Sequence, residues 1–69
     1  MPNWIVVYST INGNNANIVK AALEENGIKV VVKNKMDAMH THLLNGEIEV
    51  FVNAKDTIQA KHIISDNKL

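Results

Sequence analysis

The chain has 69 residues, a formal net charge of zero at pH 7 and no cysteine. A chain of this length is expected to form one domain, residues 1–69, whose core alone gives about 3–5 kcal/mol of stability. Without cysteine, disulfides and thiolate zinc sites are excluded as further sources of stability. Self-association, most simply as a homodimer, is therefore the expected supplement.

All seven basic residues are lysine. Arginine supplies the planar fork that binds phosphates and guanine edges through two hydrogen bonds, whereas lysine acts as a point charge. A neutral chain without arginine is a poor candidate for binding nucleic acid or an anionic membrane. The apolar run Trp4 to Tyr8 is too short for a signal peptide or a transmembrane helix, so a soluble, cytoplasmic protein is expected.

The first two predicted elements are a strand and a helix. Residues 4–9 are β-branched and aromatic and apolar on both sides, which favours a strand flanked by protein. Residues 14–26 follow as an amphipathic helix with an apolar stripe made of Ala16, Val19 and Leu23. Either Asn12 or Asn14 is the expected N-cap. Gly27 stands where a left-handed C-terminal cap is expected.

Two further strands are predicted, at residues 28–33 and 47–52, because apolar and polar residues alternate in both. In the later strand Val50 and Val52 are expected to face the helices, and Phe51 to face away from them. The outward lysines and glutamates of the two strands have opposite signs and can pair across the sheet.

The segment at residues 34–46 carries no clear pattern, and a short helical turn and a loose loop both fit it. The last predicted element is a helix at residues 54–64, with Asn53 as its expected cap. Its inner face contains Ala60 and Ile63, whereas Ile58 lands on the opposite side and should be exposed.

The topology follows from handedness. A right-handed β-α-β connection makes the first two strands parallel and leaves room for one strand between them, which the third strand fills. The predicted fold class is α+β, a β-α-β-β-α split unit. Its three-stranded antiparallel sheet has the order first, third, second, and two helices cover one face. This arrangement is ferredoxin-like without a fourth strand. The other sheet face and one sheet edge stay uncovered.

The aromatic residues indicate a candidate interaction surface on the uncovered face. In the first strand, either the even-numbered residues from Trp4 to Tyr8 or their odd-numbered neighbours point outward, and the small aliphatic core favours packing the odd-numbered set inside. The predicted patch consists of Trp4, Tyr8, Val31 and Phe51. Monomers rarely expose such a patch, and a two-fold homodimer is the commonest way to cover it. In the alternative, Trp4 folds over the core edge and Phe51 is a single exposed residue.

The chemistry-bearing residues form no catalytic constellation. Glu24 and Glu25 lie at a helix end in solvent, and Glu47 and Glu49 lie on an open face opposite lysines, whereas acid–base catalysis needs a cleft and a displaced pKa. No enzymatic activity and no cofactor are therefore expected.

The histidines leave a second interpretation open. His40 and His42 are two residues apart, a spacing that aims both rings to one side of a strand, and Asp37 could add an oxygen ligand. The alternative is that these are solvated loop histidines, since no strand is predicted there.

Residues along nearly the whole chain match the pattern of a known family. They are Val7, Tyr8, Thr10, Asn12, Ala16, Leu23, Glu24, Gly27, Ile28, Asn34, Lys35, Gly46 to Val50, Asp56 and Ala60. In these positions the chain resembles the small prokaryotic domains described as putative signal-transducing proteins. The resemblance implies a ferredoxin-like fold similar to that of PII-like nitrogen-regulatory proteins, which assemble through their sheets. The chain is much shorter than those and has no nucleotide-gripping loop, so the resemblance does not extend to ATP binding. Many relatives carry an acidic residue where this chain has Asn15.

The sequence therefore predicts a non-enzymatic interaction or signal-transducing module with an unknown protein partner. It would act through the open sheet face or through a strand added to the free edge of the first strand. The alternative function is a small-ligand or metal-binding domain that uses the histidines of residues 34–46.

Overall fold

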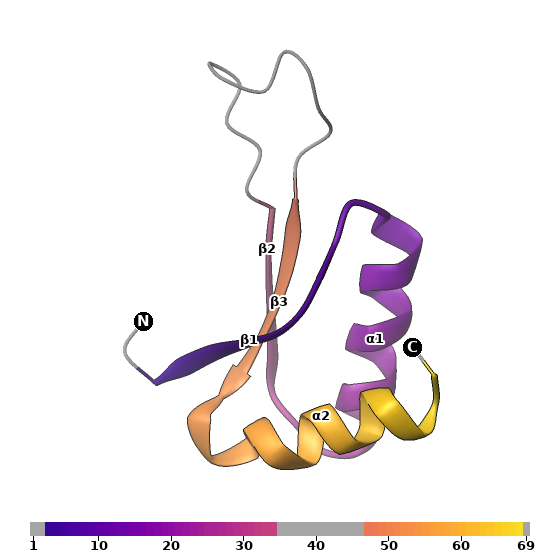
Figure 1. Ribbon diagram of the computed structural model, residues 1–69. Helices are drawn as coiled ribbons and strands as arrows, with labels where there is room; N and C mark the ends of the chain where they lie inside the picture. Colours follow the sequence, from indigo (N-terminus) through magenta and orange to yellow (C-terminus); the bar gives the residue numbers. More distant parts are fainter. Residues whose placement is uncertain (1–2, 35–46, 69) are drawn as a thin grey trace.

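The computed structural model describes residues 3–34 and 47–68. Its elements, in chain order, are β1 (Trp4–Thr10), α1 (Gly13–Glu25), β2 (Val30–Asn34), β3 (Ile48–Asn53), the 3-10 turn η1 (Ala54–Asp56) and α2 (Thr57–Asp66). Strand β3 lies in the centre and runs antiparallel to both neighbours, in the order β1-β3-β2 (Figure 1). The predicted α+β class and strand order are confirmed.

The hydrophobic core lies between the sheet and the two helices. Its four largest fully buried side chains are Leu23 and Val19 of α1 and Val50 and Val52 of β3. From α2, Ala60 and Ile63 join the same cluster. Because both helices pack against Val50 and Val52, they cover the same face of the sheet. Here we call the opposite surface the open face.

The ends of α1 follow the predicted chemistry. The Asn12 side-chain oxygen accepts hydrogen bonds from the backbone N–H groups of Asn14 at 2.8 Å and Asn15 at 3.2 Å, so Asn12 is the cap. Gly27, just beyond the helix, has a φ of +79°, the left-handed conformation that lets the chain turn back toward the sheet. The backbone N–H of Ile28 then donates to the carbonyl of Leu23 at 3.2 Å.

The start of the second helix differs from the prediction. Residues 54–56 form η1, and α2 begins only at Thr57. Asn53 occupies the N-cap position of η1, but its side chain makes no capping hydrogen bond, and the residue before α2 is Asp56. The backbone N–H of Ala54 instead donates to the carbonyl of Asn3 at 2.7 Å, which ties this turn to the start of β1. Ile58 is 86% exposed, as predicted.

A β-bulge in β1 decides which of its side chains face the helices. Val6 lies opposite Phe51 and Tyr8 lies opposite Val50, so Val7 is an extra residue between two pairs. Val7 and Tyr8 both pack against the core. Since a bulge places two residues opposite one, the strict alternation assumed from the sequence stops at this point. In β1, therefore, neither the even-numbered nor the odd-numbered residues all face the same side of the sheet.

No helix within residues 3–34 and 47–68 has the length and apolar character needed to cross a membrane.

Candidate functional site: the open face of the sheet

An apolar row crosses all three strands on the open face. Val6 of β1 and Val31 of β2 each lie directly opposite Phe51 of β3, on its two sides. Side chains in such cross-strand positions are close enough to pack against one another. Val6 is 38% exposed, and Phe51 and Val31 are half-buried. We call these three residues the apolar row.

Trp4 extends this surface toward one end of the sheet. It lies opposite Asn53, two positions beyond Phe51 along β3, and is half-buried. Because side chains alternate along a strand, Asn53 and Phe51 share a face, and Trp4 joins them there. The apolar part of the open face therefore contains Trp4 and the apolar row.

A polar row lies on the other side of the apolar row. Ser9 of β1 and Lys33 of β2 both lie opposite Glu49 of β3. The Ser9 hydroxyl donates a hydrogen bond to the Glu47 carboxylate at 2.5 Å, which holds that carboxylate beside β1. The charges therefore run in a fixed order across the sheet. The carboxylate of Glu47, a residue just before β3, lies beside β1, Glu49 lies in the centre and Lys33 lies on the edge strand β2. We call Ser9, Glu47, Glu49 and Lys33 the polar row.

Three of the four residues predicted for the interaction patch lie together. Trp4, Val31 and Phe51 are on the open face, whereas Tyr8 is on the helix side, so its assignment to the patch is corrected. The physical reason is the bulge, which turns Tyr8 toward the core opposite Val50. Val6 takes its place beside Phe51. Val6 could have been identified from the sequence, because it is two residues from Trp4 in the same strand and therefore lies on the same face.

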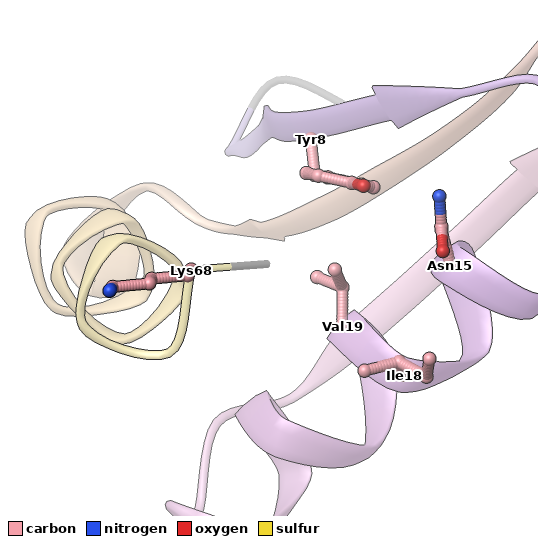
Figure 2. Close-up of a pocket in the computed structure, with 5 residues that line it drawn as sticks. All are labelled: Tyr8, Asn15, Ile18, Val19 and Lys68. Carbon is pink, nitrogen blue, oxygen red and sulfur yellow. The ribbon is translucent and has the colours of Figure 1, made fainter.

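Tyr8 lines a cleft of about 410 Å³ on the helix side instead, together with Asn15, Ile18, Val19 and Lys68. Figure 2 shows the polar ends of Tyr8 and Asn15 directed into the same space, whereas the Lys68 side chain extends away from them. The cleft thus combines a hydroxyl and a carboxamide with aliphatic neighbours. This arrangement can donate and accept hydrogen bonds.

A smaller cleft of about 240 Å³ is lined by Gly27, Lys29, Asn53, Lys55 and Asp56. It contains two lysines and one carboxylate, so its charges partly offset one another.

The residues of the predicted ligand or metal site, His40, His42 and Asp37, lie outside the described residues. Among those that are described, no group of three or more His, Cys, Asp or Glu side chains could hold a metal ion. His62 Nε2 lies 3.0 Å from a carboxylate oxygen of Asp66, one turn further along α2. Both side chains are well exposed, so this surface pair contributes little to stability.

The borders of the sheet are less suited to binding than its face. Within the described part of the chain, β1 and β2 each pair on one side only. The bulge interrupts β1, and the short strand β2 carries Lys33. Bulges and lysines on outer strands both discourage the addition of another strand.

The comparison with protein families identifies a family that matches almost the whole chain. The family described as "putative prokaryotic signal transducing protein" matches residues 4–68, a span that includes both rows of the open face. Among curated proteins and solved structures, no significant match to the chain was found.

Proposed function

We propose that this chain, which belongs to the family described as putative prokaryotic signal transducing proteins, is a non-enzymatic interaction module that binds protein through its open face. The observation that carries the proposal is the apolar row. Three apolar side chains in register across a whole sheet form a continuous surface, and such surfaces on small proteins mark interaction sites.

The size of this surface sets the expected strength of binding. Burying the exposed remainder of Val6, Phe51 and Val31 contributes on the order of 3 kcal/mol for one chain, since complete burial of one such side chain gives about 1.5–3 kcal/mol. A partner with a similar row brings the total to about 6 kcal/mol, which lies within the range of about 4–15 kcal/mol that association costs in lost translational and rotational freedom. The apolar row alone therefore gives little net affinity, and Trp4 and the polar row are needed as additional contacts. The resulting complex is reversible, as a signalling contact requires.

A face-to-face contact explains the arrangement better than strand addition. The bulge in β1 and Lys33 on β2 disfavour pairing at either border, whereas the face presents apolar side chains in one plane. A second copy of the chain is the simplest partner, because the same patch then covers itself around a two-fold axis. We therefore propose a homodimer as the basal state of the module.

Phe51→Lys tests this proposal, with Ile58→Lys as the matched control. Both variants add one lysine, but Phe51 lies in the apolar row, whereas Ile58 is 86% exposed on α2. Sedimentation equilibrium should give twice the 7.7 kDa chain mass for the unmodified protein and for Ile58→Lys. Phe51→Lys should give the mass of a single chain while keeping its circular dichroism spectrum.

Two outcomes would contradict the proposal. One is an unmodified chain that stays at 7.7 kDa at every concentration studied. The other is a folded Phe51→Lys variant that stays a dimer. Should Phe51→Lys fail to fold, Val6→Lys serves instead, because Val6 is already 38% exposed and its replacement disturbs the core less.

A further inference from the structure

We infer that two copies pack their open faces around a two-fold axis parallel to the strands, so that Lys33 of each copy faces Glu47 of the other copy. This inference rests on the proposed function and adds to it the residues that determine the partner and its orientation. The charges of the polar row would select a second copy of this chain and fix its orientation.

The order of charges across the polar row is the starting point. Ser9 holds the Glu47 carboxylate beside β1, and Lys33 lies on β2, the opposite border of the sheet. An axis parallel to the strands places β1 of one copy over β2 of the other. The negative border of each copy then covers the positive border of its partner, and two Lys33–Glu47 contacts form.

The same axis also matches the apolar row to itself. Val6 and Val31 stand on opposite sides of Phe51. Reversing the row therefore places Val6 of one copy over Val31 of the other, with the two Phe51 rings near the axis. Packed sheets lie about 10 Å apart, a spacing that side chains from both inner faces fill together.

The alternative axis, in the plane of the interface but across the strands, is less favourable. Rotation about this axis places β2 of one copy over β2 of the other, but with the two strands running in opposite directions. Lys33 of one copy would then approach the beginning of β2 of the other, where Lys29 shares the face of Val31. Like charges would meet at this border, and Glu47 would face the end of the sheet that carries Trp4.

One feature of the favoured arrangement opposes association. Glu49 lies on the central strand between Ser9 and Lys33. Near the axis it therefore faces Glu49 of the other copy. Two attractive contacts at the borders and one repulsive contact in the centre leave a net preference for this orientation, and they keep the dimer weak.

Charge reversal tests the inference with three variants, Lys33→Glu, Glu47→Lys and the control Lys61→Glu. The first two positions are exposed on the open face, and Lys61 is exposed on α2. Each of the first two variants alone meets like charges at both borders, so its self-association should weaken about tenfold or more. The control should associate as the unmodified chain does.

Mixing the two open-face variants is the decisive step. In a mixed dimer, the glutamate introduced by Lys33→Glu in one copy faces the lysine introduced by Glu47→Lys in the other. At the second border the unchanged Lys33 and Glu47 face each other, so both contacts are attractive again. Native mass spectrometry of an equimolar mixture should show the mixed dimer exceeding both self-dimers. A variant that had merely lost its fold would not be rescued by mixing.

The outcomes separate this inference from the proposed function. In one outcome, Lys33→Glu and Glu47→Lys dimerise as strongly as the Lys61→Glu control while Phe51→Lys is a monomer. This result would contradict the proposed two-fold axis but would still support the open face as the interface. A mixture without preference for the mixed dimer would also overturn it. Dimers that survive Phe51→Lys as well would show that the open face is not the interface, and the proposed function would then fail too.

Discussion

Val7 and Tyr8 are adjacent in β1, yet both pack against the core on the helix side of the sheet. The bulge opposite Val50 brings the two residues to one side, where regular alternation would separate them. It thereby removes an aromatic side chain from the open face and leaves Val6 as the neighbour of Phe51. The composition of the candidate site depends on this one extra residue.

Tyr8→Ala should therefore lower stability without changing the oligomeric state. We expect the free energy of unfolding to fall by about 2 kcal/mol, less than for a fully buried aromatic residue because Tyr8 is half-buried. Urea unfolding measures this loss, and sedimentation gives the mass of the folded variant. Tyr8→Phe, which keeps the ring, should change stability far less. A folded Tyr8→Ala variant that has lost its dimer would argue against this placement.

Gly27→Ala should destabilise the protein by about 1 kcal/mol, because a side chain at a φ of +79° is strained. No atom of the described residues lies within 4 Å of the added Cβ, so the expected cost comes from the backbone. Gly13→Ala is the matched control. Its Cβ would lie 4.0 Å from Ile48 Cδ1, an ordinary contact, and helix propensity favours alanine there. Equal effects in thermal unfolding would contradict this assignment.

Asn12→Ala should cost about 1 kcal/mol of stability, since its side chain accepts from two backbone N–H groups at the start of α1. Asn14→Ala, two residues later and exposed, keeps this cap and should be nearly neutral. Chemical unfolding of both variants measures the difference. If the two losses were the same, Asn12 would not be acting as the cap.

Leu23→Ala should be among the most damaging substitutions in the core. Leu23 is completely buried between α1 and the sheet, and such truncations cost about 2–5 kcal/mol. For a domain of this size that approaches the whole stability of the core, so the variant should be largely unfolded at about 37 °C by circular dichroism. Ile58→Ala, at an exposed position of α2, should unfold at nearly the temperature of the unmodified chain.

Glu49→Gln should strengthen self-association, because it removes the like charges that meet near the proposed axis. Glutamine keeps the length of the side chain and can still form hydrogen bonds across the interface. We expect a dissociation constant several-fold lower, measured by sedimentation equilibrium at low salt, where charge effects are largest. A weaker dimer would indicate that Glu49 makes a favourable contact instead.

Most of the fold could be predicted from local patterns and handedness. The alternation in β3 correctly separated Val50 and Val52 from Phe51, and the right-handed connection placed β3 between β1 and β2. An asparagine cap at Asn12 or Asn14 and the turn at Gly27 were also predictable, because each depends on the chemistry of one residue and its nearest neighbours; the structure selects Asn12 as the cap.

The features that escaped prediction depend on contacts between distant residues. The run from Trp4 to Tyr8 is apolar on both sides, so it contains no break in pattern where the bulge falls. The hydrogen bond between Ser9 and Glu47 joins residues 38 positions apart and needs the assembled sheet. Residues 54–56 form a 3-10 turn whose first N–H donates to the carbonyl of Asn3, a partner that the helical pattern does not reveal.

The bulge in β1 also bears on how far the proposed self-association could proceed. Sheets that associate through their edge strands leave a new edge strand free after each addition and can grow into filaments. A face that packs against the same face of a second copy forms a closed two-fold dimer and leaves no such surface free. In the proposed dimer, the bulged edge strand β1 and the lysine on the edge strand β2 would disfavour open-ended polymerisation. Rising protein concentration would then saturate dimer formation without producing longer assemblies.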